Sequence, residues 1–410
     1  MRFFSIVASL LALNSFAKCT PIAHQLPLGM AIGEPDNRGN ISIKLFAELE
    51  ELSRIVDISY CVGITGISKP FQCSSRCNDF PDFELVDTFN TGPLMSDSCG
   101  YIALDHGTKY NGKGRLIVAF RGTYSIANTI VDLSTVPQEY VPYPDDPEND
   151  ATSAENYKAK CNNCTVHTGF WTSWQNTRPF ILPHVEAAKK KYPDYQLHLV
   201  GHSLGGAVAG LAGLEFDSMG FQPIVTTFGE PRLGNSGLRD WIDLTFSLPS
   251  EHAPNGRSDL KAGRYRRMTH VDDPVPLLPL QEWGYRAHAG ELFISKPSLQ
   301  PSITDIQLCY GDEDVNCIAS AEVDESWFNV VANINEVTAN FPENEQEISR
   351  ISRRWGIPIP ARYKIWQLFF AHRDYFWRLG LCVPGGDPMD WGRGRYDFGE
   401  DDSTLEKVDL

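Results

Sequence analysis

The sequence has no excess of basic charge. Its 410 residues include 36 Lys and Arg against 52 Asp and Glu, which gives a formal net charge of −16. Because binding to nucleic-acid phosphates needs basic surface, this balance argues against nucleic acid as the main partner. An acidic, solvated surface is instead the expected interpretation, and the charge by itself says nothing about the fold.

Two other features are missing after the first residues: a run of membrane length and an internal repeat. Residues 1–17 combine the basic Arg2, an apolar run too short to span a bilayer, and the small residues Ser15 and Ala17. This three-part pattern predicts a signal peptide that is cleaved after Ala17. We therefore expect a secreted protein without stable membrane insertion, and residues 18–44 are interpreted as an N-terminal arm or propeptide.

The ten cysteines fit an exported protein, because oxidising compartments favour disulfides. Cys-x-x-Cys occurs once, and no second such pair or histidine pair completes a zinc site, so we expect no metal. A bridge between the distant Cys61 and Cys382 would stabilise the fold by roughly 5–6 kcal/mol in the chain-entropy model. Cys19 and Cys99 are left without an assigned partner. Asn40 and Asn163 begin glycosylation sequons, which also fit secretion.

Apolar strands alternate with helical segments along most of the chain. Helices are expected over residues 40–60 and 178–193 and directly after Ser203, and strands over 101–106, 115–122, 195–200, 223–231 and 264–270. This alternation predicts a mostly parallel central sheet with helices on both faces. We expect one large α/β domain over 45–385, with a polar insertion at about 319–360 and a loose acidic tail over 386–410.

The motif Gly-His-Ser-Leu-Gly, residues 201–205, lies between an apolar strand and a helix rich in small residues. A Gly-x-Ser-x-Gly sequence in this setting predicts a nucleophile elbow, in which a sharp turn exposes Ser203 and leaves no room for bulky neighbours. The helix N-terminus favours developing negative charge beside the serine. The backbone N–H of Leu204, the residue after the nucleophile, is expected to donate to the oxyanion.

A serine nucleophile needs a base, and the base needs an acid that orients it. In a Ser, acid, His chain order, Asp272 and Asp273 are acid candidates, because they follow a predicted strand and precede a proline. His288 and His372 both fit as the base. The residues alone do not choose between the two histidines.

Four further motifs carry a family resemblance: "VGHSLGGA", "FGEPRLGN", "THVDDPVP" and "AHRDYF". Together with "FRGT" and "CNNCTVHTGF" they resemble the fungal class 3 lipases, the secreted triacylglycerol lipases of yeasts and moulds. The similarity covers roughly residues 45–317 and 362–385. It implies an α/β-hydrolase fold in a single large domain with a helical lid.

The resemblance also implies specific roles. Ser203 matches the nucleophile, Asp273 the acid, His372 the base and Thr123 a second oxyanion donor, whereas His288 matches a position without a catalytic role. The implied disulfides are Cys61–Cys382, Cys73–Cys77, Cys161–Cys164 and Cys309–Cys317. The implied lid falls at about 124–135, where Ile126, Ile130 and Leu133 have the spacing of one helical face.

These features predict a secreted serine carboxylic-ester hydrolase that acts on triacylglycerols at an oil–water surface, as a monomer and without a cofactor. Two alternatives stay open at this point. The same chemistry would serve a phospholipase or an esterase for feruloyl or other soluble esters. A catalytically silent, lipid-binding secreted protein is a more distant possibility. The sequence departs from compact family members in the long stretch between Asp273 and His372 and in the acidic tail.

Overall fold

The structure is a computed structural model of the chain. It describes residues 41–63, 65–92, 98–107, 113–123, 133, 140–142, 161, 163–249, 263–311, 313–323 and 370–396. The predicted signal peptide, the sequon at Asn40, the lid residues Ile126 and Ile130, and nearly all of the expected insertion lie outside these ranges. All described residues belong to one compact unit, Arg38–Leu410.

The core is an eight-stranded sheet in the order β1-β2-β3-β6-β7-β8-β9-β10. Its elements in chain order are α1 (Ile43–Ile58), β1 (Phe83–Asn90), β2 (Cys99–Asp105), β3 (Arg115–Arg121), α3 (Thr168–Lys191), β6 (Gln196–His202), α4 (Leu204–Ser218), β7 (Ile224–Phe228), α5 (Ser236–Phe246), β8 (Tyr265–His270), β9 (Glu291–Ile294) and β10 (Ile306–Leu308). A separate hairpin pairs β4 (Tyr140–Pro142) with β5 (Thr165–His167). Strands β3, β6, β7, β8 and β9 run parallel, and the strands at the two edges are antiparallel.

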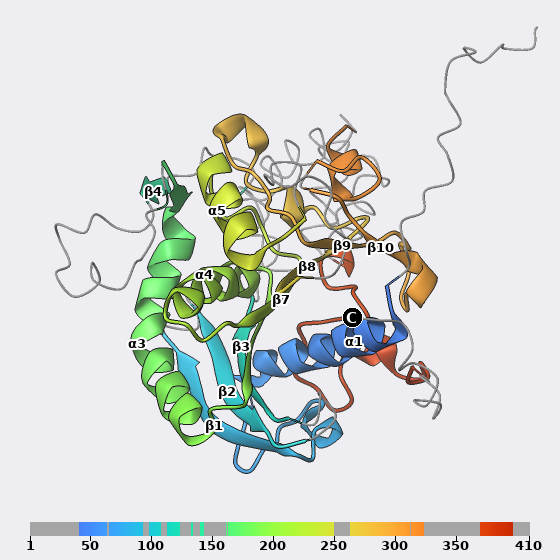
Figure 1. Ribbon diagram of the computed structural model, residues 1–410. Coiled ribbons are helices and arrows are strands. Elements are labelled where there is room, and N and C mark those ends of the chain that lie inside the picture. The colour runs from blue at the N-terminus through green and yellow to red at the C-terminus, as the bar shows by residue number, and fades with distance from the viewer. Residues whose placement is uncertain are drawn as a thin grey trace, which may run out of the picture. The chain divides into compact units, whose positions relative to one another are not determined.

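Helices cover both faces of the sheet, with α1 on one side and α3 and α4 on the other (Figure 1). Side chains of a strand point alternately to the two faces, and β3 shows the consequence. Leu116, Val118 and Phe120 join the apolar cluster of α3, α4 and α5, while Ile117 and Ala119 join the cluster of α1. This confirms the expected helix–sheet–helix layering, which places the carboxyl ends of the parallel strands at one edge.

Helix α3 is longer than predicted. It begins ten residues before the expected range of 178–193, and His167 caps its start by accepting a hydrogen bond from the Phe170 N–H at 3.3 Å. Pro179 and Pro183 lie inside it. A proline inside a helix is unfavourable, because it lacks an N–H and its ring clashes with the preceding turn, whereas Pro179 would be tolerated in the first turn of the expected helix. Here tertiary packing of the first turns, which bury Phe170 and two tryptophans, outweighs that preference.

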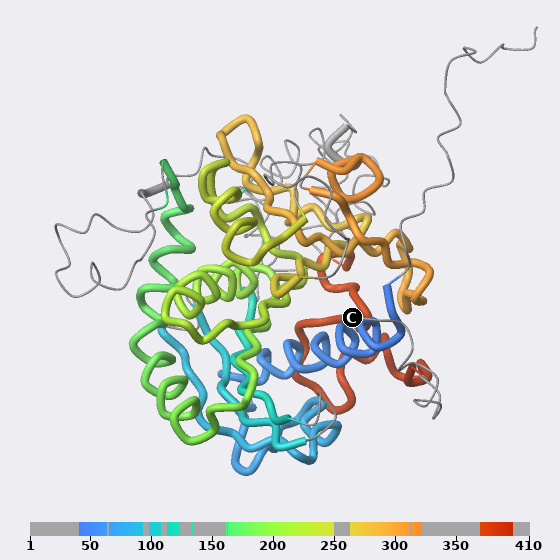
Figure 2. The backbone as a smooth tube through the Cα atoms, viewed as in Figure 1, coloured from blue at the N-terminus to red at the C-terminus, as the bar shows by residue number. Residues whose placement is uncertain are grey.

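The segment 370–396 runs beside α1 (Figure 2). The Phe376 ring meets Phe46 of α1 edge-on at 5.2 Å, and the Trp377 indole donates to Glu50 at 2.6 Å. Residues 386–396 therefore do not start the loose tail that the sequence predicted. Asp387 accepts from the Arg373 guanidinium at 2.8 Å, and Asp390 accepts from the Arg378 N–H at 2.9 Å. Both carboxylates are buried, because they neutralise or cap groups of the same segment.

All four disulfides implied by the resemblance are present: Cys61–Cys382, Cys73–Cys77, Cys161–Cys164 and Cys309–Cys317. The Cys61–Cys382 bridge ties the end of the α1 region to the segment that carries His372. The Cys99 thiol donates to the Asn90 side chain at 3.1 Å. Asn163, the second sequon residue, is exposed.

Removing the Cys61–Cys382 bridge should cost more stability than removing Cys73–Cys77. The two bridges close loops of sequence separation 321 and 4. For these lengths the chain-entropy model gives about 6 and about 2 kcal/mol. We expect Cys61→Ala/Cys382→Ala to lose more free energy of unfolding than Cys73→Ala/Cys77→Ala, as measured by guanidinium denaturation. Equal losses would contradict the loop-length argument.

Candidate active site

Ser203 lies in a strained turn between β6 and α4. Its backbone φ and ψ are 58° and −129°, in a region that residues with a side chain rarely adopt. Such a conformation costs on the order of 1–3 kcal/mol and persists only when the surroundings enforce it. Here the Ser203 N–H donates to the Phe228 carbonyl at 2.9 Å, and the Ser203 carbonyl accepts from Gly206 at 2.8 Å. The serine is held between the end of β7 and the first turn of α4.

The flanking glycines are required by close backbone approaches. A Cβ atom on Gly201 would lie 2.2 Å from the Gly205 carbonyl oxygen, and one on Gly205 would lie 2.4 Å from the Phe120 carbonyl oxygen. Both distances are far below contact distance, so neither position accepts alanine without a backbone shift. The first glycine of the Gly-x-Ser-x-Gly motif is thus required by the tightness of the turn itself, and the second by packing of the turn against the end of β3.

Asp273 and His372 meet in a buried hydrogen bond. Asp273 follows the end of β8, and His372 comes from the segment beside α1. The His372 Nδ1 atom lies 2.9 Å from both carboxylate oxygens of Asp273, and both side chains are fully buried. A carboxylate can only accept, so Nδ1 carries the proton, and in the neutral ring Nε2 keeps its lone pair.

Three donors hold Asp273 as a carboxylate. Burial alone would raise the pKa of Asp273, but the His372 charge and hydrogen bond, the Tyr375 hydroxyl and the Val275 N–H together leave the pKa below its usual value. The Tyr375 hydroxyl donates to Oδ2 at 2.5 Å and the Val275 N–H to Oδ1 at 2.9 Å. The acid therefore stays ionised and fixes the orientation of the His372 ring.

Two buried atoms at the site lack hydrogen-bond partners among the described residues: Ser203 Oγ and His372 Nε2. An unpaired buried polar atom costs roughly 1–3 kcal/mol, so proteins tolerate few of them. The residue before Ser203 brings the two side chains into one neighbourhood, because His202 Nε2 lies 2.8 Å from the His372 carbonyl oxygen. The Ser203 hydroxyl and the acceptor nitrogen of His372 are therefore both buried and unpaired in the same region.

The loop after β3 also reaches Ser203. A Cβ on Gly122 would lie 2.8 Å from the Ser203 Cβ. The buried Arg121 guanidinium donates to the Gly122 carbonyl at 3.0 Å and to the Val62 carbonyl at 3.2 Å. The C=O and N–H of a trans peptide point in opposite directions, so holding the Gly122 carbonyl also orients the N–H of Thr123.

The alternative acid and base have different surroundings. His288 is buried and contacts Glu230 through Nε2 at 3.0 Å and its neighbouring Ala289 carbonyl through Nδ1 at 2.7 Å. Glu230 also accepts from the Tyr265 hydroxyl at 2.8 Å, so His288 belongs to a separate polar cluster. Asp272 is exposed.

Sequence reasoning missed four residues around the site: Tyr60, His202, Gly229 and Tyr375. A Cβ on Gly229 would lie within 2.8 Å of Asp273 Oδ2 and His372 Cε1 and 2.7 Å of the Tyr375 hydroxyl. His202, Gly229 and Tyr375 lie within the quoted motifs "VGHSLGGA", "FGEPRLGN" and "AHRDYF", and this was the available signal. Tyr60 precedes Cys61, and the implied bridge from Cys61 to Cys382 was the signal that placed it near the His372 segment.

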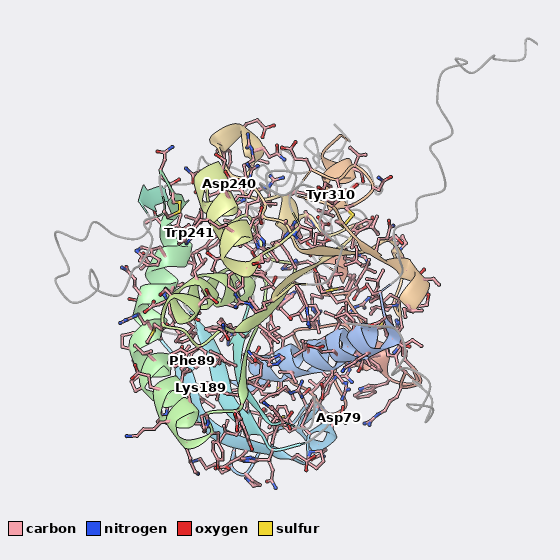
Figure 3. The ribbon with its side chains drawn as sticks, in the orientation of Figure 1. Asp79, Phe89, Lys189, Asp240, Trp241 and Tyr310 are labelled. Atoms are coloured by element: carbon pink, nitrogen blue, oxygen red, sulfur yellow. A yellow bond between two sulfur atoms is a disulfide. The ribbon has the colours of Figure 1, made fainter. Side chains whose placement is uncertain are left out.

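A cavity of about 180 Å³ lies away from these residues, between β1 and α3. Its lining includes Phe89, which Figure 3 labels beside α3, and the exposed Phe180. Of the three expected lid residues, only Leu133 is described, and it is buried in the apolar cluster of α3 and α4. No helix in the described part of the chain is long and apolar enough to cross a membrane.

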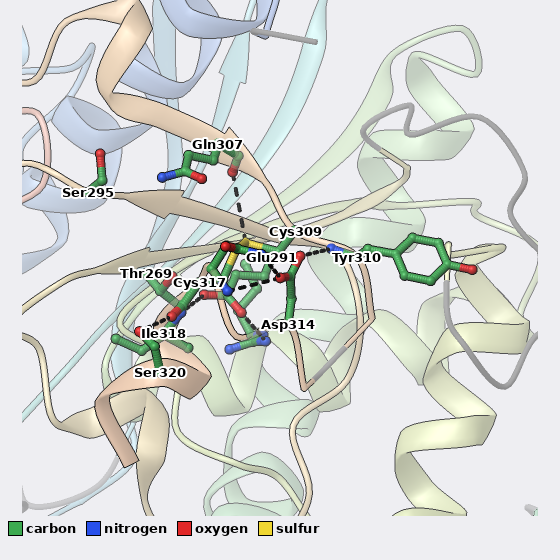
Figure 4. The surroundings of a disulfide bond; sticks show 12 residues. Thr269, Glu291, Ser295, Gln307, Cys309, Tyr310, Asp314, Cys317, Ile318 and Ser320 are labelled. Atoms are coloured by element: carbon green, nitrogen blue, oxygen red, sulfur yellow. Dashed lines mark hydrogen bonds and ion pairs between the residues drawn. A yellow bond between two sulfur atoms is a disulfide. The ribbon is translucent and has the colours of Figure 1, made fainter. Parts of the chain in front are cut away.

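Glu291, Cys309 and Cys317 form a compact buried group whose atoms are of metal-ligand type. Both sulfurs are used in the disulfide, and Figure 4 shows Glu291 surrounded by donors instead. Its carboxylate accepts from Thr269 at 2.5 Å and from the Ile318 N–H at 3.1 Å, and it pairs with Arg267 at 3.3 Å. The group is a structural polar cluster that does not fit a metal ion.

Comparisons with known proteins place the chain in a family. A family model described as lipase (class 3) matches residues 117–283. The chain is 54% identical over 374 residues to secreted mono- and diacylglycerol lipase 2 of Gibberella zeae, covering 88% of each chain. It is 51% identical over 383 residues to lipase A of Sodiomyces alcalophilus, covering 89% of each. The chain belongs to the class 3 lipase family.

The solved structure of the Yarrowia lipolytica LIP2 lipase extends this result to the fold of the class 3 lipase. It superposes with a TM-score of 0.62 at 28% identity, covering 84% of this chain and 98% of that one. The predicted α/β-hydrolase fold is therefore confirmed, and the chain is a lipase, a carboxylic-ester hydrolase. The Gibberella relative is named as a secreted protein, which supports the extracellular localisation predicted for this chain.

Gly229→Ala should damage activity far more than stability in this class 3 lipase. Gly229 has φ +59° and its added Cβ would press on Asp273 and His372, whereas Gly220 has φ +84° and open space around it. Both alanines add strain of roughly 1–2 kcal/mol, but only the first displaces the histidine. We expect a loss of about 100-fold or more in kcat for Gly229→Ala and none for Gly220→Ala. Melting temperatures and kcat of both variants check this, and near-normal kcat in Gly229→Ala would contradict it.

Proposed function

We propose that this lipase is a serine hydrolase in which Ser203, His372 and Asp273 form the catalytic triad. Ser203 Oγ attacks the ester carbonyl carbon while His372 Nε2 takes the hydroxyl proton. The same nitrogen then delivers this proton to the leaving alcohol, and water releases the acyl group by the reverse sequence. Asp273 holds the imidazole orientation and stabilises the imidazolium.

The buried Asp273–His372 hydrogen bond carries this proposal. It leaves His372 Nε2 as an acceptor, and both this nitrogen and Ser203 Oγ are buried without a hydrogen-bond partner among the described residues. His288, the other candidate base, is occupied by Glu230. A nucleophile, a base and an orienting acid are the three groups that acyl transfer to serine requires.

The oxyanion is proposed to bind between α4 and the loop after β3. Leu204 is the first residue of α4, so its N–H is one of the helix-terminal donors without an intrahelical partner. Thr123 supplies the second donor through its N–H, whose direction Arg121 sets through the Gly122 carbonyl, and through its hydroxyl. Such donors act mainly on the charge that develops in the transition state.

The substrate is proposed to be an acylglycerol at a lipid–water interface. The predicted class is triacylglycerol, and the Gibberella and Penicillium relatives, named mono- and diacylglycerol lipases, favour partial glycerides as a second candidate. The region 124–135 is the proposed lid. Leu133, the one residue of this region that the structure describes, is buried in the apolar cluster of α3 and α4, and burial of apolar surface would hold such a lid closed in water. Opening would present that apolar surface to lipid.

Ser203→Ala should abolish ester hydrolysis. Removal of a triad serine costs about 10⁶ in turnover, because no other group attacks the carbonyl. Release of p-nitrophenol from a soluble p-nitrophenyl ester by the purified variant measures this. The matched control is Ser218→Ala at the other end of α4, where the hydroxyl only caps the Glu215 carbonyl at 2.6 Å. Unchanged hydrolysis by Ser203→Ala would overturn the mechanism.

The substrate class is tested with emulsions of triolein, diolein and monoolein, with phosphatidylcholine and with a soluble feruloyl ester. An interfacial lipase should show a sharp rise in rate when an acylglycerol exceeds its solubility limit. Fatty-acid release followed by titration identifies the preferred glyceride. Hyperbolic kinetics on the feruloyl ester with little release from any emulsion would instead assign a soluble-ester esterase. Preferential release from phosphatidylcholine would assign a phospholipase.

A further inference from the structure

Two buried polar side chains, those of Tyr60 and His202, contact each other next to the Ser203 turn. Tyr60 belongs to the short helical turn that follows α1, and His202 is the last residue of β6. Tyr60 is 2% exposed and His202 is fully buried. The Tyr60 hydroxyl oxygen lies 2.5 Å from His202 Nδ1, and the mechanism above uses neither residue.

The partners of His202 fix its tautomer. Its Nε2 atom lies 2.8 Å from the His372 carbonyl oxygen, and a carbonyl can only accept, so Nε2 carries the hydrogen. Nδ1 is then an acceptor, and the Tyr60 hydroxyl donates a hydrogen bond to it. Burial, with the nearby His372 charge, lowers the pKa of His202 to about 3, so the ring stays neutral and keeps this pattern at neutral pH.

The Tyr60 hydroxyl has a second contact, with the loop after β3. The Gly122 N–H forms a backbone hydrogen bond to it, and a Cβ on Gly122 would lie only 2.6 Å from the hydroxyl oxygen. A phenolic hydroxyl can donate once and also accept, so both contacts form together. The Tyr60 hydroxyl oxygen thus contacts Gly122, which precedes Thr123. Through His202 it is also linked to the backbone of His372.

The backbone of Tyr60 is itself fixed to the segment that carries His372. Its neighbour Cys61 is disulfide-bonded to Cys382, ten residues beyond His372. Arg121 adds a further tie, because its guanidinium joins the Gly122 carbonyl to the Val62 carbonyl. The turn after α1 is therefore a rigid support that contacts the β3 loop, the Ser203 turn and the His372 segment.

We propose that Tyr60 and His202 are positioning residues for ester hydrolysis: their hydrogen-bonded pair holds the His372 backbone and the Gly122–Thr123 peptide in register with Ser203. Neither residue touches the substrate or the reacting atoms. The inference rests on the proposed roles of Ser203, His372 and Thr123. It adds that one buried hydroxyl aligns the base and an oxyanion donor at the same time.

The test compares Tyr60→Phe with Tyr101→Phe. Tyr101 is a matched control, because it is also buried and its hydroxyl donates to a backbone carbonyl, that of Ile55, at 2.8 Å. A displacement of about 1 Å at a catalytic group can cost 100-fold, so Tyr60→Phe should lower kcat on p-nitrophenyl butyrate by about 10- to 100-fold. KM should stay within about twofold, and modification of Ser203 by a p-nitrophenyl phosphonate should slow in parallel with kcat.

Tyr101→Phe should lose a similar amount of thermal stability and keep its kcat. Equal kcat in the two variants would overturn the proposal. Ser203→Ala is assayed alongside, so that the two hypotheses fail separately. Hydrolysis by Ser203→Ala would reject the proposed function, whereas an inactive Ser203→Ala with a fully active Tyr60→Phe would reject the positioning role alone.

A second pair of variants tests the His202 contact without changing Tyr60. His202→Gln places an amide N–H near the position of imidazole Nε2 and can still donate to the His372 carbonyl, whereas His202→Leu cannot. A hydrogen bond is worth about 1 kcal/mol, so kcat of the glutamine variant should exceed that of the leucine variant by roughly fivefold or more. Equal kcat values in both folded variants would contradict a role for this bond.

Discussion

The hydrogen bond between His372 and Asp273 is the contact on which the proposed chemistry depends. It joins side chains 99 residues apart in sequence, one at the end of β8 and one on a segment with little regular structure. A bond of this kind orients a base only if both backbones are rigid. The segment of His372 gains that rigidity from the Cys61–Cys382 bridge and from aromatic packing on α1. Packing on the α1 face of the sheet thus determines whether the His372 imidazole is aligned.

The Ser203 turn adds an opposite requirement. It stores backbone strain and leaves a buried hydroxyl unpaired, and both features destabilise the fold. The cores on the two faces of the sheet compensate, because α4 packs against β3, β6 and β7 through small residues while α1 covers the other face. Glycines at 201, 205 and 229 allow backbones and side chains to approach closely there. The stability of the two apolar cores therefore offsets the strain at the Ser203 turn.

Much of the fold followed from periodicity, since the parallel strands are short apolar runs between helices. Strands β1, β9 and β10 were not predicted. β9 has only four residues, too few for alternation to be visible, and β1 alternates irregularly because its register shifts between Leu85 and Asp87. The start of α3 was missed because Pro179 suits the first turn of a helix, whereas the real helix begins ten residues earlier. Residues 386–396 looked like a tail because their acidic and glycine-rich composition does not reveal that Asp387 and Asp390 are buried partners.

The sequence by itself determined the sharp turn at Ser203, since a Gly-x-Ser-x-Gly motif between a strand and a helix already indicates a turn without room for bulky neighbours. Motif resemblance, and no local rule, pointed to Asp273 and His372 among four candidates. Only the tertiary structure decided which side chains surround them: Tyr375 on the carboxylate, Gly229 against the ring, and Tyr60 and His202 behind the serine. These contacts join positions far apart in the chain. Burial and hydrogen-bond geometry across the sheet create them, and no spacing rule in the sequence encodes them.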